Sequence, residues 1–246
     1  MSVVDIKEFP VHRMKAASKI FAIGGTGCGK STLMVDLLYH QRHKIASAVL
    51  ISAADDEKDP LIKLFPDAYI HNKMHPMIIT SFVQRQKLLM ASHCPYSFAS
   101  LCIDDSGYDQ KFVNSKQMQY IMKLNRHNEM QLLFSMHGAK GANKKIRHFI
   151  DYAFIGKEKS YEEREALYKN YASMIPSFDL FQDIMDKVTV DKQFLVIDLK
   201  NDSNEMKDCV FSYKAQLHPN FSLGCQEWHD WARLRYNPNY TPTFEI

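Results

Sequence analysis

The loop from Gly24 to Ser31 matches the phosphate-binding pattern G-x-x-x-x-G-K-[ST] at every fixed position. The loop directly follows the strand-like run 19–23 and precedes the helix-like run 33–38. Glycines let the backbone turn tightly, so that successive N–H groups face phosphate oxygens at the positive end of a helix. The loop therefore predicts a strand, a turn and a helix that together hold a nucleoside triphosphate.

The pattern also predicts what the side chains of this loop do. We expect Lys30 to reach the β- and γ-phosphates, Ser31 to offer a hydroxyl to Mg²⁺, and Thr32 to lie near the α-phosphate. Cys28 is expected to be a small loop filler, although a thiol in this position could react with alkylating agents. The predicted nucleotide-binding residues are Gly24, Gly25, Thr26, Gly27, Cys28, Gly29, Lys30, Ser31 and Thr32.

Apolar runs alternate with helix-length stretches along most of the chain. The expected strands are 19–23, 48–52, 98–103, 131–135, 152–155, 193–198 and 209–213. The expected helices are 30–41, 78–92, 111–125 and 161–171. This alternation predicts an α/β fold, a P-loop NTPase with a mostly parallel central sheet flanked by helices. Functional side chains should then emerge at the C-terminal ends of the strands.

The length of 246 residues is enough for one full hydrophobic core. We expect one ATPase domain over 1–217, with a short N-terminal extension over 1–15, and an irregular C-terminal tail over 218–246 that docks as an arm. No apolar run approaches the length of a membrane span, and 1–15 lacks the apolar segment of a signal peptide. We therefore expect no transmembrane segment, and we expect the protein to be made in the cytosol and to begin there.

Cysteine and histidine give no clear metal signal. The five cysteines are an odd number without close pairing, which argues against a disulfide framework and against a four-thiolate zinc site. The histidine pairs His40 with His43 and His71 with His75 lack a recognisable completing ligand set. We expect no zinc site at either pair.

Two adjacent acids end another strand-like run. Asp104 and Asp105 follow the strand-like run 100–103 and begin 74 residues after Lys30. This arrangement is typical of a Walker B strand, in which one acid holds Mg²⁺ through its water and the next orients or deprotonates the attacking water. We assign Asp104, with Ser31, to the metal, and Asp105 and Lys30 to catalysis. The paired acids favour hydrolysis over kinase chemistry, because small-molecule P-loop kinases need no water-activating acid.

A third element lies at 123–128, directly before the strand-like run 131–136. Arg126 in this element is a candidate arginine finger, a residue that supplies charge to the transition state and often comes from a neighbouring subunit. His137, at the end of the strand, is a candidate sensor of the γ-phosphate. The simpler interpretation of Arg126 is a solvated helix C-terminus, and that of His137 is an ordinary loop histidine.

These elements together resemble the genome-packaging ATPases of large DNA viruses and their small viral relatives, in the FtsK/HerA branch of P-loop motors. The likeness rests on 23–32, 102–105 and 125–127. It implies an oligomeric ring, acting at a viral assembly site or in the host cytoplasm, that hydrolyses ATP to push double-stranded DNA into a preformed capsid. A capsid or portal component is then an expected partner. One departure is His137, where the family usually has Gln, although His still donates a hydrogen bond to phosphate.

The most basic segment, 140–148, contains no acid and follows His137 closely. We expect it to contact the phosphate backbone of double-stranded DNA without reading its sequence, although most charge runs are simply solvated surface. Arg147 in this segment is the alternative arginine finger. No sequence-specific recognition motif for DNA or RNA is evident.

Two other functions stay open on the sequence alone. One is a different P-loop phosphotransferase, such as a nucleotide kinase. The other is a nucleotide-gated, non-motor assembly protein that binds ATP to dock on a capsid or membrane through its tail.

Overall fold

The computed structural model describes residues 6–52, 59–105, 109–203 and 205–237. Two parts of the predicted organisation lie outside these residues. They are 1–5 of the N-terminal extension and 238–246 of the C-terminal tail. Among the described residues, each helix is too short or too polar to span a lipid bilayer.

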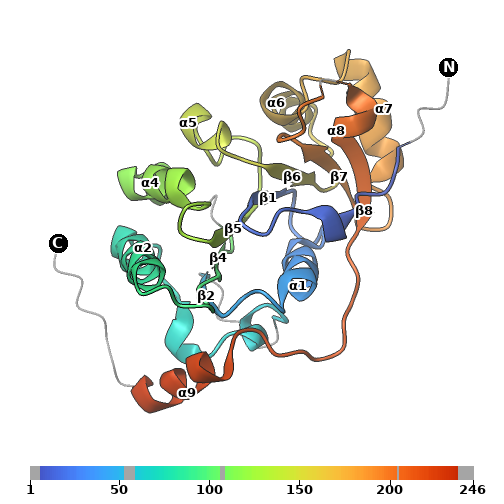
Figure 1. The fold of residues 1–246 in the computed structure, drawn as a ribbon. Coiled ribbons are helices and arrows are strands. Elements are labelled where there is room, and N and C mark those ends of the chain that lie inside the picture. The colour runs from blue at the N-terminus through green and yellow to red at the C-terminus, as the bar shows by residue number, and fades with distance from the viewer. Residues whose placement is uncertain (1–5, 53–58, 106–108, 204, 238–246) are drawn as a thin grey trace.

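An eight-stranded sheet forms the centre of the fold, in the order β3-β2-β4-β5-β1-β6-β7-β8 (Figure 1). Strands β1 to β6 pair with one another in parallel, whereas β6–β7 and β7–β8 are antiparallel pairs. The bounds of the strands are β1 Lys19–Ile23, β2 Ser47–Ile51, β3 Ile70–His71, β4 Ala99–Ile103, β5 Met130–Met136, β6 Tyr152–Ile155, β7 Gln193–Asp198 and β8 Val210–Lys214. The predicted α/β fold with a mostly parallel sheet is therefore confirmed.

Helices cover both faces of this sheet. The bounds of the α-helices are α1 Lys30–Gln41, α2 Pro76–Ala91, α3 Gln110–Val113, α4 Lys116–Leu124, α5 Lys144–Arg147, α6 Tyr161–Tyr171, α7 Phe178–Val188, α8 Met206–Cys209 and α9 Gln226–Arg235. Short 3₁₀ helices are η1 Val11–Arg13, η2 Ile62–Leu64 and η3 Asp67–Tyr69. Helices α2, α4, α5, α6 and α7 lie on one face and α1 on the other (Figure 1).

Alternating side chains along the strands create the two cores. On β1, Phe21 and Ile23 belong to the cluster beneath α2, α4, α6 and α7, whereas Ile20 and Ala22 pack toward α1. All four side chains are fully buried. A strand that is covered on both faces buries every side chain, so apolar residues are favoured at each position. This explains why the residues of β1 after Lys19 are all apolar.

The expected helix over 111–125 is in fact two helices. Asn114 and Ser115 separate α3 from α4, and the Ser115 hydroxyl accepts a hydrogen bond from the Met118 N–H. A serine in this position favours a new helix start over continuation, because its side chain satisfies a backbone donor that would otherwise lack a partner. The start of α4 is therefore set by this cap.

The predicted tail contains a helix, so the expectation of an irregular segment is wrong for residues Gln226–Arg235. Helix α9 buries Trp228 and Ala232, four residues apart on one face, and Trp228 belongs to the same cluster as the buried side chains of α1. The Trp228 ring lies 5.1 Å from the ring of Tyr69 in η3. The Cys225 N–H donates to the Ala46 carbonyl at 2.8 Å, which anchors the start of the helix. The tail therefore packs on the sheet domain through this segment.

The two tryptophans of α9 provide a matched test of this packing. Trp228 is 3% exposed and Trp231 is 53% exposed. Replacing a buried tryptophan by alanine removes apolar contacts and leaves a cavity, so Trp228→Ala should lower the free energy of unfolding by about 3–5 kcal/mol. Trp231→Ala should change it by less than about 0.5 kcal/mol. Urea unfolding followed by circular dichroism measures both, and equal losses for the two variants would contradict the docked position of α9.

Candidate nucleotide site

The register of the central strands brings the predicted motifs to one edge of the sheet. Ile23 at the end of β1 is level with Met136 of β5 and Ile155 of β6. On the next pair, Ile103 of β4 is level with Phe134 of β5. The segments that follow these parallel strands must therefore lie side by side at the C-terminal edge, as ligand-binding segments of open α/β sheets do.

A cavity of about 690 Å³ lies at this edge. Its lining residues are Thr26, Gly27, Gly29, Lys30, Ser31, Thr32, Asp104, Asp105, Ser135, His137 and Lys192. The cavity is within the size range of small-molecule sites. It combines loop backbone, a lysine, hydroxyl groups and two carboxylates, which are the groups that a nucleotide with a metal ion requires.

The backbone of the loop requires glycine at two positions. Gly27 has φ 78° and Gly29 has φ 99°, both in the left-handed region that residues with a Cβ adopt at an energetic cost. Gly29 is also the residue directly before α1. Inside the loop, the Lys30 ammonium donates to the carbonyls of Gly24 at 2.8 Å and Gly25 at 3.1 Å. These contacts hold the lysine within the cavity at the N-terminus of α1.

Cys28 fills space beneath the loop. A Cβ on Gly24 or on Gly156 would lie only 2.8 Å from the Cys28 sulfur, so the thiol packs tightly between the two glycines. Burial raises the pKa of the Cys28 thiol, and the nearby Lys30 only partly opposes this shift. A thiol with a raised pKa is a poor nucleophile at neutral pH, which favours the predicted role as a loop filler over reaction with alkylating agents.

The two acids after β4 are held by a serine on the neighbouring strand. The Ser135 hydroxyl donates to the Asp104 carboxylate, and the Asp105 N–H donates to the same hydroxyl at 2.7 Å. Burial raises the pKa of Asp104, and the hydrogen bond from Ser135 opposes that shift. The site therefore keeps a partly desolvated carboxylate close to the phosphate loop.

Asp105 adopts a left-handed backbone conformation, with φ 53°, and its side chain contacts His137. The His137 Nε2 lies 2.7 Å from the Asp105 Oδ1. Both side chains also line another cavity, of about 260 Å³, together with Lys140 and Glu163. Strain at a non-glycine residue is maintained only where surrounding contacts fix it. Here the Ser135 hydroxyl and His137 hold the residue.

Glu163 on α6 fixes the chain that follows His137. Its carboxylate accepts a hydrogen bond from the Ala139 N–H at 3.2 Å. A Cβ on Gly138 would lie 3.1 Å from the same carboxylate, so glycine permits the close approach. The Tyr171 hydroxyl, also on α6, donates to the Ala139 carbonyl at 3.4 Å. The backbone that follows His137 is thus fixed to α6 through both the N–H and the carbonyl of Ala139.

Arg126 lies at the opposite edge of the sheet from the cavity. It precedes β5, whereas His137 follows it, and the seven residues of β5 span about 20 Å. The Arg126 guanidinium donates to Asp151 at 3.0 Å, just before β6, and its side chain is 49% exposed. Arg126 therefore cannot reach the cavity of its own chain.

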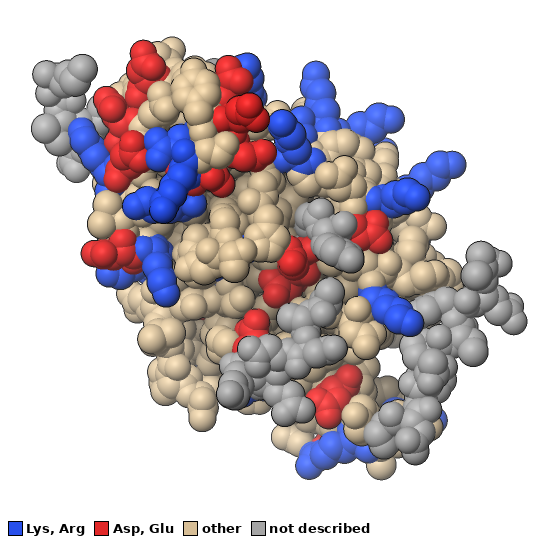
Figure 2. Space-filling model, turned by 180° about the vertical axis from the view of Figure 1, so that it is seen from behind, with Lys and Arg blue, Asp and Glu red and all other residues tan. Residues whose placement is uncertain are grey.

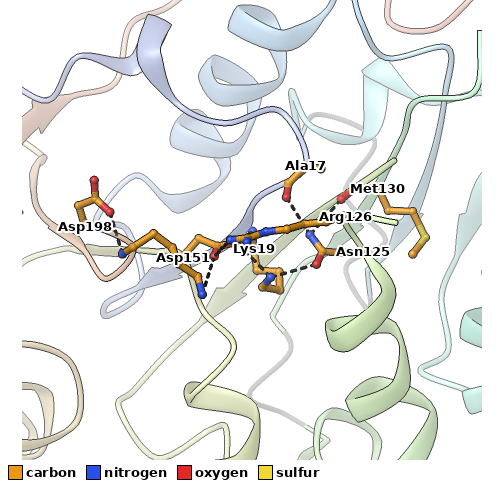
Figure 3. A network of polar contacts seen from close by, with 8 residues as sticks. Ala17, Lys19, Asn125, Arg126, Met130, Asp151 and Asp198 are labelled. Atoms are coloured by element: carbon orange, nitrogen blue, oxygen red, sulfur yellow. Dashed lines mark hydrogen bonds and ion pairs between the residues drawn. The ribbon is translucent and has the colours of Figure 1, made fainter. Parts of the chain in front are cut away.

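Asp151 is the centre of a polar network at that edge (Figure 3). Besides Arg126, the buried carboxylate lies 3.2 Å from the Lys19 ammonium and 3.6 Å from that of Lys200. Lys19 also donates to the Asn125 side chain at 3.0 Å, and Asn125 in turn donates to the Ala17 carbonyl at 2.9 Å. Burial lowers the pKa of Lys19, and Asp151 opposes that shift. The network fixes the backbone on which Arg126 stands.

The basic segment 140–148 includes the short helix α5. The Asn143 side chain accepts from the Ile146 N–H at 3.0 Å, and Ile146 is buried beneath the helix. Lys144 and Lys145 are exposed, whereas the Arg147 guanidinium turns back to the carbonyl of Ala142. The segment therefore presents lysines to solvent on a backbone that is anchored in the core.

Sequence reasoning missed three residues near the cavity, namely Ser135, Lys192 and Glu163. Ser135 lies inside a mostly apolar strand, and its only sequence signal is a single hydroxyl in that run. Its contact with Asp104 becomes visible only in the fold. Lys192 follows Asp191 in a turn where both residues have positive φ, 52° and 59°. Its closeness to Gly29 depends on pairing between β6 and β7, which no local pattern reveals.

A solved structure shares this fold. The genome packaging NTPase B204 from Sulfolobus turreted icosahedral virus 2, in complex with ATP-gammaS, matches with a TM-score of 0.64 at 14% sequence identity. The match covers 83% of this chain and 100% of that chain. The predicted resemblance to genome-packaging ATPases is thus confirmed in the fold, which is that of a P-loop NTPase.

Viral relatives are also found by sequence, although no family profile matches this chain. Uncharacterized protein 088R of Invertebrate iridescent virus 3 is 33% identical over 229 residues, 92% of this chain and 87% of the relative. Uncharacterized protein 075L of Invertebrate iridescent virus 6 is 33% identical over 227 residues, 91% of this chain and 88% of the relative. This chain belongs to the same protein family as these two iridescent virus proteins.

Proposed function

We propose that this protein is an ATP-hydrolysing motor that works as a homo-oligomeric ring and moves double-stranded viral DNA into preformed capsids. The fold shared with a viral genome packaging NTPase supports this proposal. The observation that carries it furthest is the contact between Asp105 and His137, because both residues line the nucleotide cavity and also the cavity that Lys140 of the basic segment lines. Events at the nucleotide can therefore reach a cationic surface through adjoining side chains.

The nucleotide end of the proposal rests on the phosphate loop and the acid pair. The loop backbone and Lys30 bind the phosphates of ATP, and Asp105 orients and deprotonates the attacking water. Oxygen ligands suit Mg²⁺, and the cavity offers them in the hydroxyl of Ser31 and the carboxylate of Asp104. These two residues would hold the ion, which neutralises charge that develops on the phosphates.

His137 is well situated to sense the γ-phosphate. It lines the cavity at the end of β5, and its imidazole is 46% exposed, so it can turn toward a ligand without leaving the loop. A hydrogen bond from His137 to phosphate would compete with its contact to Asp105. Only residues 138–139 join His137 to the basic segment, and Glu163 on α6 holds the Ala139 N–H. A shift of His137 is therefore transmitted through these two residues to the basic segment.

Arg126 is proposed to act on the site of a neighbouring subunit. Its position on the edge opposite the cavity suits a head-to-tail ring, in which one edge of each subunit faces the other edge of the next. The contact with Asp151 orients the guanidinium while half of the side chain stays exposed. Arg147, the alternative finger, is less suited because its side chain is less exposed than that of Arg126 and its guanidinium turns back to the carbonyl of Ala142, just before α5.

The DNA partner is supported by a cationic face over α3, α4 and α5. Residues 110–150 contain eight Lys and Arg side chains and one acid, Glu129, which accepts a hydrogen bond from Ser97. Figure 2 shows Lys and Arg side chains projecting over the α4 and α5 side, whereas acids gather over α6 and α7. Such a face neutralises phosphates without reading bases, as movement along any sequence requires.

The buried carboxylate of Asp104 predicts a pH-dependent effect on stability. Below the ordinary pKa of 3.8, Asp104 is protonated in the folded and unfolded chain alike. As the pH rises through the raised pKa of the folded state, the unfolded chain has already lost its proton, so the wild type loses stability relative to Asp104→Asn. Urea unfolding from about pH 3 to about pH 8 should show this difference growing as the pH rises above the ordinary pKa and levelling off above the raised pKa of the folded state. A difference that does not change with pH would contradict the desolvation of Asp104.

Mixing two inactive variants tests the trans role of Arg126. Asp105→Asn should bind ATP without turnover, and Arg126→Ala should lose turnover while Asp151 keeps its contact with Lys19. At equal amounts, random assembly should restore about a quarter of wild-type ATP hydrolysis, because that fraction of interfaces joins two intact halves. Arg147→Ala serves as the control for the other candidate. No recovery at any ratio would contradict a trans finger at Arg126.

DNA binding tests the cationic face. Replacing Lys140, Lys144 and Lys145 by alanine should weaken binding to linear double-stranded DNA of any sequence, and should reduce the slope of log affinity against log salt by about 2 to 3. A variant that loses three exposed lysines elsewhere, Lys169, Lys187 and Lys207, removes the same charge and should leave the slope nearly unchanged. Fluorescence anisotropy over a salt series measures both slopes. Equal slopes for the two variants would contradict a DNA face over α5.

A further inference from the structure

A buried carboxylate on α1 lies outside the nucleotide site. Asp36 is fully buried in the second turn of α1, among the apolar side chains that face the sheet. Its Oδ2 accepts hydrogen bonds from the Tyr213 hydroxyl at 2.6 Å and from the Gln216 N–H at 3.2 Å. These two donors hold the carboxylate in one orientation and leave Oδ1 facing elsewhere.

Two histidines meet at that second oxygen. The Nε2 of His218, from the segment after β8, lies 2.5 Å from the Asp36 Oδ1, and the Nε2 of His40, one turn further along α1, lies 3.4 Å from it. The three ligand atoms all lie within 4.8 Å of one another. The sequence offered His40 with His43 as a pair, whereas the fold joins His40 to Asp36 and His218.

The geometry points to a cation site: we propose that Asp36, His40 and His218 bind a divalent transition-metal ion such as Zn²⁺, which fastens the segment after β8 to α1. Ligands about 2.1 Å from a tetrahedral zinc ion lie about 3.4 Å apart. The His40 contact already has this separation, and His218 needs to move back by about 0.9 Å to match it. Solvent supplies the fourth ligand, because the His40 side chain is 29% exposed.

The groups around the three ligands support metal binding. The hydrogen bonds from Tyr213 and Gln216 orient the carboxylate, and the Tyr39 ring stacks on His218 at 3.6 Å with an angle of 10° between the planes. Such outer contacts orient metal ligands and strengthen binding. Burial lowers the pKa of His40, so that its ring is neutral and has a free electron pair at neutral pH. The positive charge of Arg42, which stacks on Tyr39, lies nearby and opposes the binding of a cation.

The donor set also predicts which ions bind. Two imidazole nitrogens and one carboxylate favour Zn²⁺ and Co²⁺ over Mg²⁺ and Ca²⁺, which prefer oxygen ligands. The site is therefore chemically distinct from the oxygen ligands of the nucleotide cavity, and it stands independently of the motor proposal. Binding would stabilise the folded chain, because the three ligands come together only when β8 and α1 are packed.

The full chain without an affinity tag and without nucleotide provides the test. Addition of Co²⁺ to the wild type should give the visible absorption of a tetrahedral ion at one equivalent, Zn²⁺ should abolish it, and Zn²⁺ should raise the thermal midpoint whereas Mg²⁺ should not. His40→Gln and His218→Gln keep a hydrogen-bond donor near the position of Nε2 but lose the imidazole ligand. Each should weaken Zn²⁺ binding by at least about tenfold.

Two variants serve as matched controls for this experiment. His43→Gln changes an exposed histidine just beyond the end of α1, and Asp104→Asn changes the nucleotide cavity. Both should bind Zn²⁺ like the wild type. Lack of the Co²⁺ spectrum in the wild type overturns the proposal without any variant. Wild-type affinity in both His40→Gln and His218→Gln also overturns it, and would mean that the histidines act only as hydrogen-bond partners of Asp36.

Discussion

Parallel pairing of β1 with β5 and β6 places the phosphate loop beside the residues that follow β5 and β6. The Gly24 N–H donates to the Met136 carbonyl at 3.0 Å, and the Gly156 N–H donates to the Ile23 carbonyl at 2.7 Å, so the ladder continues past the strands into the phosphate loop. A shift of one residue in this register would turn the apolar side chains of β1 to the wrong faces and would separate the loop from His137. Strand pairing alone therefore sets the position of the site.

The same pairing gives the sheet two edges with different chemistry. The C-terminal edge gathers the loop and two carboxylates around a cavity, whereas the N-terminal edge gathers three cations around Asp151. Removing one partner from a buried charge group leaves an uncompensated charge, so such a cluster fixes its backbone firmly. In a ring of identical subunits, this arrangement would let a rigid cationic edge face the nucleotide of the next subunit. Hydrolysis would then require residues from two neighbouring subunits.

Much of the fold could be predicted from the sequence, because the central strands are continuous apolar runs and the phosphate loop fixes what precedes and follows it. The residues missed by sequence reasoning depend on contacts between distant segments. Ser135 matters only because β5 lies beside β4, and Lys192 only because β7 turns back antiparallel to β6. Helix α9 was missed because its apolar face is just Trp228 and Ala232, too short for a clear helical period among polar neighbours. The histidines at Asp36 likewise come from segments 178 residues apart in the chain.

The decisive measurement for a DNA-coupled motor is steady-state ATP hydrolysis with and without linear double-stranded DNA, at low salt so that phosphate contacts are not screened. We expect turnover that DNA stimulates in the wild type and that is absent in Lys30→Ala, because the lysine held by Gly24 and Gly25 would bind the phosphates. Phosphate transferred to a small acceptor, or turnover in the wild type that equals Lys30→Ala with DNA present, would contradict the account of a DNA-coupled motor.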